Sequence, residues 1–367
     1  MEKLKYKALT FDDVLLLPKY SDFLPSEASI ESKLTKNITL KTPLISAAMD
    51  TVTESKMAIS LAETGGIGII HKNNSIEEQA AQVKAVKKYE SGIVRDPVTI
   101  NSKQSIRELK QLTNELSISG MPVVDDGKLE GIVTSRDFRY AENMDSEVSS
   151  IMTPFEKLIT VEEGFSQEEV MKLMYKNRIE KILVLDTNSN LSGLVTMKDI
   201  EKSAQHPNAT KDSSGRLQVG AALGTSEDTI ERAQALFESG VDVFVVDSAH
   251  GHSKNVIETI KMLKEKFKDV DIIGGNIATA EAATELVRAG ADAVKVGMGP
   301  GSICTTRIIA GIGVPQISAI LEIKKALVGS DINIIADGGI RFSGDIAKAI
   351  AAGADSVMLG SLFAGTE

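Results

Sequence analysis

Short and almost wholly apolar runs recur along the chain, each ending in glycine or a small polar residue. Runs without alternating polar positions are typical of parallel strands that are covered on both faces. Helical stretches separate them, such as 228–239, where Ile230, Ala233 and Phe237 recur at helical spacing. We predict eight strands, at residues 44–49, 67–71, 219–223, 243–248, 272–277, 293–297, 332–338 and 356–361.

The joints between helices and strands repeat as well. Gly-Val-Asp at 240–242 and Gly-Ala-Asp at 290–292 and 353–355 each place a helix-ending glycine before a short turn and a strand start. Eight strands with such joints predict an α/β fold, a (β/α)8 TIM barrel. Chemistry in these barrels lies at the carboxyl ends of the strands, and the glycine-rich motifs of this sequence fall there.

The barrel pattern stops between residues 92 and 205, where a second repeat appears. Gly-Ile-Val-Thr at 131–134 recurs as Gly-Leu-Val-Thr at 193–196, about sixty residues later. The segment resembles a tandem pair of CBS modules, about 92–150 and 151–205, inserted between the second and third barrel strands. We therefore predict that 1–91 and 206–367 together form the barrel.

Each copy of this repeat carries an aspartate three residues after its last threonine. These pairs are Thr134 with Asp137 and Thr196 with Asp199. Thr-x-x-Asp in CBS modules often contacts the ribose of an adenine or guanine nucleotide, so ATP or GTP is a candidate ligand. The same pattern also caps helices, and the sequence leaves both interpretations open.

The composition and charge of the chain exclude several classes of function. The chain has 41 basic and 51 acidic residues, a formal charge of −10 and no basic tract, which excludes an electrostatic footprint for nucleic acid or an anionic membrane. Its single cysteine excludes an internal disulfide, and the sequence shows neither a signal peptide nor an apolar span of membrane length. We therefore expect a cytoplasmic protein.

That single cysteine, Cys304, lies in a glycine-dense loop at 297–307 rather than among core residues. A thiolate there can attack an electrophilic carbon, and the backbone of such a loop can hold an anion or, through its carbonyls, a monovalent cation. The alternative is a free cysteine in a tight turn. The Gly-x-Gly-x-Gly-Ser frame, and Thr306 two residues later, favour a nucleophile.

Small-residue motifs also end the last two predicted strands. Asp337-Gly338-Gly339 ends the seventh and Gly360-Ser361 the eighth, where barrels often bind phosphate. Glycines allow backbone amides to approach a ligand, and Asp337 can accept hydrogen bonds from a ribose diol. A tight turn alone is the alternative for each motif.

Further candidates lie at the ends of other strands. Asp247 lies at the end of the fourth predicted strand and Asn276 at the end of the fifth. Both side chains could contact a dinucleotide, although an aspartate at a strand end is usually a helix cap. Met49 could pack against the base of a nucleotide, or it could be an ordinary residue of the hydrophobic core. His250 and His252 are too few for a metal site without further ligands.

Taken together, these residues resemble the inosine 5′-monophosphate (IMP) dehydrogenase family from Leu9 onward. The similarity is carried by Gly-Pro-Gly-Ser-Ile-Cys-Thr-Thr-Arg at 299–307, Ala-Gly-Ile-Gly-Val-Pro-Gln at 310–316, and Asp-Gly-Gly-Ile-Arg at 337–341. The resemblance implies that Cys304 attacks C2 of IMP, that hydride passes to NAD+, and that water releases XMP from a covalent thioimidate. This reaction is the committed step of guanine nucleotide synthesis.

The resemblance also implies a role for each matching residue. Cys304 and Thr306 would be catalytic, with Thr306 helping to position the hydrolytic water. The substrate residues would be Ser46, Met49, Ser302, Asp337, Gly338, Gly339, Gly360 and Ser361. The NAD+ residues would be Asp247, Ser248, Asn276, Gly297, Met298 and Gly299. A potassium ion would be held by the backbone carbonyls of Gly299, Gly301 and Cys304.

Other family features concern assembly and the carboxyl end. The resemblance implies a homotetramer, or an octamer formed by two tetramers that pair through their CBS modules. Members continue with a flap carrying an Arg-Tyr pair, which activates water, and with a tail. Both are absent from the 367 residues, so we expect a longer natural protein and assign no general base here.

Two alternatives stay open. GMP reductase shares the barrel and the cysteine loop but consumes NADPH and expels ammonia; the insertion and Ile-Ile-Ala-Gly at 308–311 favour the dehydrogenase. A catalytically silent nucleotide sensor is the second alternative. The presence of both Cys304 and Thr306 speaks against it.

Overall fold

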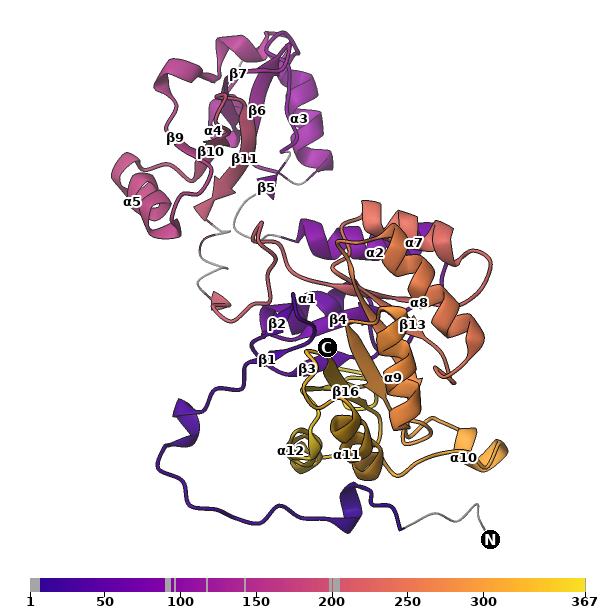
Figure 1. Ribbon diagram of the computed structural model, residues 1–367. Coiled ribbons are helices and arrows are strands. Elements are labelled where there is room, and N and C mark those ends of the chain that lie inside the picture. The colour runs from indigo at the N-terminus through magenta and orange to yellow at the C-terminus, as the bar shows by residue number, and fades with distance from the viewer. Residues whose placement is uncertain are drawn as a thin grey trace. The chain divides into compact units, whose positions relative to one another are not determined.

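Eight parallel strands close into a barrel in the order β12-β13-β14-β15-β16-β17-β3-β4 (Figure 1). The computed structural model describes residues 7–89, 94–95, 97–116, 118–141, 143–197, 200 and 205–366. The TIM barrel predicted from the apolar runs is confirmed. Its strands are β3 (Leu44–Ser46), β4 (Ile67–Ile70), β12 (Gly220–Leu223), β13 (Val243–Asp247), β14 (Asp271–Ile277), β15 (Ala293–Val296), β16 (Asn333–Asp337) and β17 (Ser356–Leu359).

Helices follow the barrel strands and cover their outer face (Figure 1). They are α1 (Ser55–Glu63), α2 (Ile76–Lys88), α7 (Thr229–Glu238), α8 (Lys254–Lys266), α9 (Ala280–Ala289), α11 (Gln316–Ala326) and α12 (Ser343–Ala352). The short helix α10 (Thr306–Ile309) buries none of its residues. No helix in the described ranges is both long and apolar enough to cross a bilayer.

The apolar runs are unbroken because each strand is buried on both faces. Val243 and Val245 of β13 point into the barrel, where they join the interior cluster of Ile45 and Ile273. Their neighbours Phe244 and Val246 belong instead to the cluster between barrel and helices. A short hairpin, β1 (Ser32–Lys33) with β2 (Thr39–Leu40), adds Leu34, Ile38 and Leu40 to the interior cluster.

The structure explains both the glycine and the aspartate in the repeated helix-to-strand turns at 240–242, 290–292 and 353–355. Gly290 and Gly353 end α9 and α12 with φ of 107° and 114°, in the left-handed region that favours glycine. Each aspartate then accepts a backbone N–H near the start of the preceding strand. Asp242 accepts from Val219, Asp292 from Ile272 and Asp355 from Ile334, at 2.8, 2.9 and 2.8 Å.

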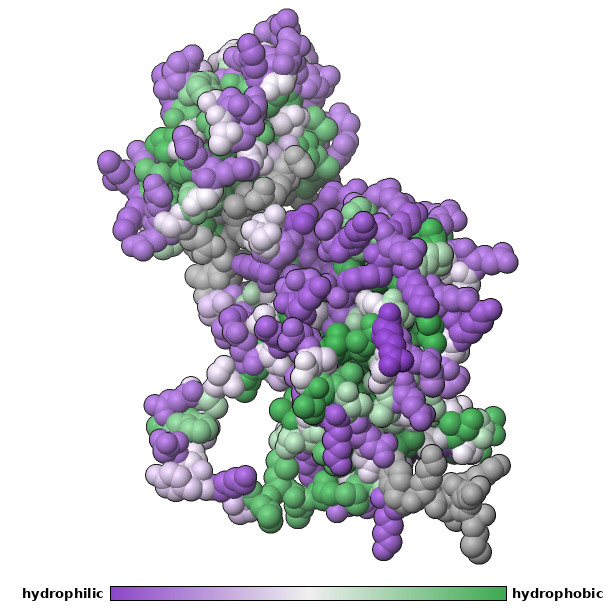
Figure 2. Space-filling model, in the orientation of Figure 1, coloured by the Kyte–Doolittle hydropathy of each residue, from purple (hydrophilic) through white to green (hydrophobic). Residues whose placement is uncertain are grey.

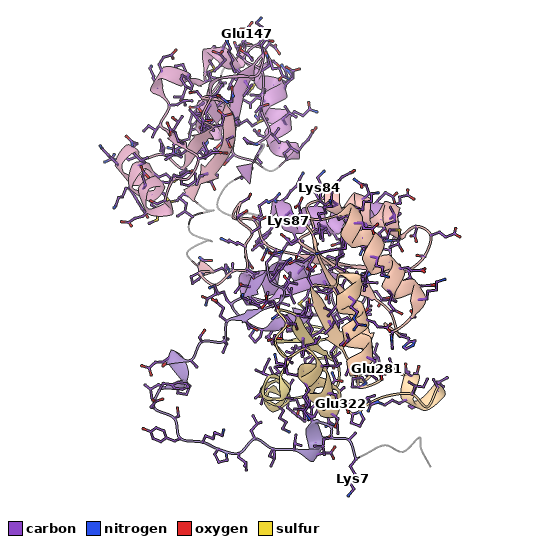
Figure 3. All side chains as sticks on the ribbon, in the orientation of Figure 1. Lys7, Lys84, Lys87, Glu147, Glu281 and Glu322 are labelled. Atoms are coloured by element: carbon purple, nitrogen blue, oxygen red, sulfur yellow. The ribbon has the colours of Figure 1, made fainter. Side chains whose placement is uncertain are left out.

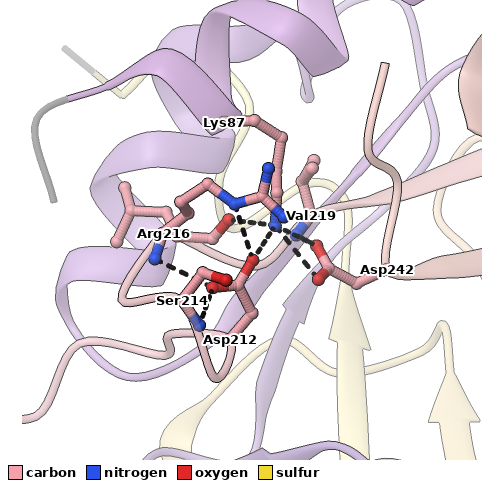
Figure 4. A network of polar contacts seen from close by, with 7 residues as sticks. Lys87, Asp212, Ser214, Arg216, Val219 and Asp242 are labelled. Carbon is pink, nitrogen blue, oxygen red and sulfur yellow. Dashed lines mark hydrogen bonds and ion pairs between the residues drawn. The ribbon is translucent and has the colours of Figure 1, made fainter. Parts of the chain in front are cut away.

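A buried ion-pair network at the amino-terminal ends of β12 and β13 ties α2 to the segment that leads into β12 (Figure 4). The Nζ of Lys87 donates to both carboxylate oxygens of Asp242, at 3.0 and 2.9 Å, and to Asp212 at 2.9 Å. Asp212 also accepts from the backbone and the guanidinium of Arg216, both at 3.0 Å. Figure 3 shows Lys84 and Lys87 at one end of the barrel and Glu281, in the first turn of α9, towards the other.

The chain divides into two compact units, Met1–Tyr89 with Asn208–Glu367, and Glu90–Pro207. The second unit holds two hairpins of matching topology, β6 (Gly120–Asp125) with β7 (Lys128–Thr134), and β10 (Lys181–Leu185) with β11 (Leu191–Thr196). A preceding segment runs parallel to the first strand of each hairpin: Ile100 bridges Val123, and β9 (Thr160–Glu162) pairs with β10. Helices of this unit that the structure describes in full include α3 (Ile106–Glu115), α4 (Ser135–Phe138) and α5 (Gln167–Asn177).

The two hairpins of the second unit exchange edge strands. β5 (Val94–Arg95) precedes the first hairpin but pairs with β11, and β8 (Thr153–Pro154) precedes the second but pairs with β7. One apolar cluster contains Leu129 and Ile132 from the first hairpin and Leu183, Leu185 and Leu194 from the second. The two copies therefore share a core within one unit. Asp199, the second aspartate of the repeat, lies outside the described residues.

A long amino-terminal segment lies away from the barrel core between two anchored points. Phe11, in the 3-10 helix Phe11–Asp13, is buried, and the Ser32 hydroxyl donates to the Asp355 carbonyl. Between them, Leu15, Leu17 and Tyr20 are 84%, 84% and 92% exposed. Figure 2 shows hydrophobic side chains along this extended segment. Apolar exposure this extensive is typical of a surface that another molecule covers.

Candidate active site

The candidate residues from the strand ends lie at one mouth of the barrel. Parallel pairing brings their strands into line: Ser46 is opposite Leu359, Val296 opposite Ala336, and Asp247 opposite Gly275. Because all eight strands run in the same direction, their carboxyl ends meet at this mouth. The loops that follow β3, β13, β14, β15, β16 and β17 therefore surround a common space.

The cysteine loop leads from β15 into the short helix α10. The Sγ of Cys304 lies 3.2 Å from the Oγ1 of Thr306, and the Cys304 N–H donates to the Gly301 carbonyl at 3.0 Å. The Thr306 hydroxyl and backbone, with lesser contributions from Gly299 and Arg307, lower the pKa of the Cys304 thiol. Cys304 is only partly buried, so a ligand can reach its sulfur. A partly exposed thiol with a lowered pKa is suited to nucleophilic attack.

The cysteine loop packs directly on the turn after β16. A Cβ at Gly338 would lie 3.0 Å from the Gly301 nitrogen, and one at Gly339 would lie 3.1 Å from the Cβ of Pro300. At Gly297 a Cβ would stand 2.0 Å from the Asp337 carbonyl oxygen, which no side chain could tolerate. These glycines let two backbone segments approach each other at the mouth.

A polar cluster joins the ends of four neighbouring strands, β13 to β16. The Nδ2 of Asn276 donates to the Gly297 carbonyl at 2.9 Å and to Oδ2 of Asp337 at 2.8 Å. The Nζ of Lys295, a residue of β15, donates to Oδ1 of Asp247 at 2.8 Å and to Oδ2 of Asp337 at 2.7 Å. It also donates to Oδ1 of Asn276. Asp247, Asn276 and Asp337, which the sequence suggested separately, thus belong to one network.

Sequence reasoning missed Lys295. Its side chain is 4% exposed and lies in a strand whose other residues are apolar. A lysine inside such a run is the signal that could have found it, because a buried cation needs paired anions. Lys72 and Gln316 were missed as well. The Gln316 amide donates to the carbonyls of Val296 and Asp337, at 2.7 and 3.2 Å, and so supports the bases of two site loops.

The other substrate candidates lie on two further strand ends. The Ser46 hydroxyl is buried and has no hydrogen-bond partner among the described residues. Met49 and Gly360 are neighbours, since a Cβ at Gly360 would lie 3.1 Å from the Met49 sulfur. Ser302 and Ser361 are exposed at the mouth, free to meet a ligand.

The cofactor candidates lie at the ends of β13 and β14 and at the start of the cysteine loop. Ser248 follows β13, where its backbone exchanges hydrogen bonds with Gly275 and Asn276 at 3.0 and 2.8 Å. Met298, at the start of the cysteine loop, packs against the core around the barrel. The two groups are joined through the Asn276 contact with Gly297.

A hollow of about 720 Å³ lies beside the cysteine loop. It is lined by Met49, His71, Lys72, Ile303 and the loop 224–226, among others. The Nζ of Lys72 donates to the Asp247 carbonyl at 2.6 Å, and burial lowers the pKa of Lys72 despite the attraction of the Asp247 carboxylate. The buried Nε2 of His71 makes no hydrogen bond among the described residues.

Side chains and backbone carbonyls differ as possible ligands for an ion at this site. His252 pairs with Glu285 at 3.0 Å, and in the described part of the chain no group of three His, Cys, Asp or Glu could hold a metal. In the same part, the carbonyls of Gly299 and Cys304 accept no backbone hydrogen bond, whereas that of Gly301 accepts one. A carbonyl oxygen has two lone pairs, so all three could also ligate a cation. The loop therefore fits a monovalent cation held by oxygen.

Fold and site together define a (β/α)8-barrel enzyme with its chemistry at the carboxyl ends of the strands. The family model described as IMP dehydrogenase / GMP reductase domain matches residues 8–367. The chain belongs to this family and is an oxidoreductase.

Its similarity to curated relatives extends over the whole chain. It is 54% identical to the inosine-5'-monophosphate dehydrogenase of Haemophilus influenzae over 366 residues, which is 100% of this chain and 75% of that protein. It is 55% identical to that of Aquifex aeolicus over 370 residues, again 100% and 75%. A solved structure, GMP reductase from Trypanosoma brucei in complex with guanosine 5'-triphosphate, matches with a TM-score of 0.88 and 43% identity. The match covers 100% of this chain and 89% of that one.

Proposed function

We propose that this protein oxidises IMP to XMP with NAD+ through a covalent intermediate on Cys304. The observation that carries the proposal is the partly exposed thiol beside Thr306, with its lowered pKa, in a loop that packs on Gly338. The identity of 54% to proteins named inosine-5'-monophosphate dehydrogenase supports the choice of reaction.

In the proposed mechanism the Cys304 thiolate adds to C2 of the purine, which forms a C–S bond and makes that carbon tetrahedral. Hydride then leaves C2, and the carbon becomes the thioimidate of xanthosine monophosphate. A water molecule attacks the same carbon, the C–S bond breaks, and XMP leaves while the thiolate is restored and a proton is released. The Cys304 thiol donates to the Thr306 hydroxyl at 3.2 Å. Once the thiol is ionised, this hydroxyl would donate to the thiolate and help to orient that water.

The substrate would be held from three strand ends. Asp337 would accept hydrogen bonds from the ribose hydroxyls, while amides and hydroxyls of Ser302, Gly338, Gly339, Gly360 and Ser361 would hold the phosphate. Ser46 and Met49 would line the base pocket, and the buried Ser46 hydroxyl, which has no partner among the described residues, supports a ligand contact there.

NAD+ would lie across the loops that carry Asp247, Ser248, Asn276 and 297–299, beside the hollow of about 720 Å³. When bound, it supplies the hydride acceptor. K+ would be held by the carbonyls of Gly299, Gly301 and Cys304, and would order the cysteine loop by its charge. In the described part of the chain no backbone N–H donates to the carbonyls of Gly299 and Cys304, which supports that ligand set.

GMP reductase remains the second candidate because its structures resemble this chain closely. The inserted unit cannot separate the two activities, contrary to our expectation, since the Trypanosoma brucei GMP reductase match covers 100% of this chain. The higher identity to the dehydrogenases, 54% against 43%, favours IMP oxidation.

The proposed reaction predicts that the full-length protein forms one NADH and one XMP for each IMP consumed in the presence of NAD+. Absorbance of NADH and chromatography of the nucleotides measure both products. GMP with NADPH is the matched control reaction. Consumption of NADPH with release of ammonia, and no NADH from IMP, would assign the protein to the reductases.

We also propose that the unit at 92–205 is a tandem CBS pair that binds ATP or GTP. A hollow of about 250 Å³ lies between its two copies, lined by four basic side chains, Arg136, Lys157, Arg178 and Lys181. Such charges suit a polyphosphate. Asp137 accepts from both the backbone and the hydroxyl of Thr134, at 2.6 and 2.7 Å, so it caps α4 while both residues also line the hollow.

Calorimetry with ATP and GTP tests this nucleotide site. We expect saturable heat for at least one of them, and about tenfold weaker binding after replacing Arg136 and Lys157 together by alanine. Lys172→Ala, an exposed change on α5 of the same unit, is the control and should bind as the wild type does. Absence of heat with both nucleotides would contradict the proposal.

The assembly we propose is a homotetramer, or an octamer of two tetramers. The exposed apolar side chains of the segment after Phe11 support an interface between copies of this chain. Sedimentation of the full-length protein distinguishes these states, and a monomer would contradict both.

A further inference from the structure

Lys295 is a buried cation between the residues proposed for IMP and those proposed for NAD+. Its side chain is 4% exposed, and its Nζ lies 2.8 Å from Asp247 and 2.7 Å from Asp337. A third hydrogen bond goes to the side-chain oxygen of Asn276. A lysine ammonium has three donors. All three are therefore engaged, by side chains of β13, β14 and β16.

The network extends from Lys295 towards the cysteine loop. Asn276, held by Lys295 through its oxygen, donates through its nitrogen to both Asp337 and the Gly297 carbonyl. Gly297 is the first residue after β15 and begins the loop that carries Cys304. One buried ammonium group thus fixes the orientation of both carboxylates and of the amide between them.

We propose that Lys295 is a positioning residue that holds Asp337 towards the substrate and Asp247 towards the cofactor, so that loss of this one cation weakens both ligands together. The inference deepens the proposed function and rests on it, because the ligand assigned to each aspartate comes from that proposal. Lys295 itself is buried below the two carboxylates and has no donor left for a ligand.

The charges around the network support this role. Burial acts to raise the pKa of Asp247, but the attraction of Lys295, aided by Lys72 from the loop after β4, holds it below its ordinary value. Burial also acts to lower the pKa of Lys295, and the attraction of Asp247 and Asp337 outweighs it and raises that pKa. Lys72 in turn faces Arg232 of α7. Lys295 therefore stays charged at every working pH.

The test is Lys295→Met in the full-length protein. We expect the KM for IMP and the KM for NAD+ each to rise about tenfold or more, because hydrogen bonds to a charged group contribute about 1.5–3 kcal/mol. With Lys295 gone, burial raises the pKa of Asp247. Its protonation at low pH then removes an acceptor, so kcat/KM for NAD+ should begin to fall at a higher pH in the variant than in the wild type.

Lys87→Met is the matched control. Lys87 is also a buried lysine that bridges two aspartates, with a side chain 3% exposed, but it lies at the amino-terminal ends of the strands. We expect it to leave both KM values and the pH profile unchanged. A rise in only one KM for Lys295→Met, or a loss of activity with the wild-type pH profile, would overturn the proposal.

Asp247→Asn keeps the proposal testable if Lys295→Met does not fold. The network predicts that this change raises the KM for IMP as well as for NAD+, since Lys295 loses a charged partner and shifts relative to Asp337. A rise for NAD+ alone would overturn it. If the wild type forms no NADH from IMP, the proposed function fails separately, and calorimetry of IMP with the wild type and Asp247→Asn still reports whether the network positions Asp337.

Discussion

Cys304→Ala lowers NADH formation from IMP and NAD+ by about 10⁴-fold or more, because the variant cannot form the C–S bond from which hydride leaves. Steady-state rates of the full-length protein measure the loss. Intact mass after quenching during turnover measures the bond itself. Since Cys304 is the only cysteine of the 367 residues, an adduct on a thiol within them can lie nowhere else.

Thr306→Val is the companion variant for this prediction. It keeps the nucleophile but removes the hydroxyl that lies 3.2 Å from the sulfur. Because that hydroxyl lowers the pKa of Cys304, its loss should raise the pKa and move the onset of alkylation by iodoacetamide to higher pH. An unchanged alkylation profile, or an adduct in Cys304→Ala, would refute the assigned chemistry.

Lys87→Met lowers the free energy of unfolding by about 3–5 kcal/mol, because it leaves Asp242 buried without a cation and leaves Asp212 with Arg216 alone. For a unit of this size, such a loss corresponds to a fall in Tm of roughly 10 °C. Denaturant titration and thermal melting measure the two quantities.

Lys84→Met is the control for that prediction. Lys84 is exposed on the same helix, α2, one turn before Lys87 (Figure 3). Surface changes of this kind usually alter stability by less than about 0.5 kcal/mol. Equal melting temperatures for the two variants would show that the buried network contributes nothing to stability.

The barrel could be predicted from the sequence because its signals are local. The run at 243–248 predicts β13, and the glycine at 290 predicts the end of α9, each from a few neighbouring residues. Predicted strand ends extend beyond the observed ones, as at 44–49 against Leu44–Ser46, because small residues after the strand are as apolar as those within it.

The polar network could not be predicted because its members are far apart in the sequence. Asp247, Asn276 and Asp337 were each suggested singly, but only the closed barrel brings them to one ammonium group. The reciprocal pairing of β5 and β8 in the second unit was missed for the same reason. Edge strands of two residues carry no periodic pattern, and their partners lie in the other copy.

The Lys87 network also affects how the barrel accommodates the unit inserted at Glu90–Pro207. Lys87 lies just before residue 90, where that unit begins, and Asp212 just after residue 207, where it ends. Topologically the unit is a loop between α2 and β12, and the entropy of closing a loop rises by only about 0.6 kcal/mol for each doubling of its length. Because Lys87 and Asp212 hold the two ends of this loop together, the length of the loop adds little to the free-energy cost of closing the barrel. We therefore expect that the length of the segment inserted at this junction can change with little effect on the stability of the barrel.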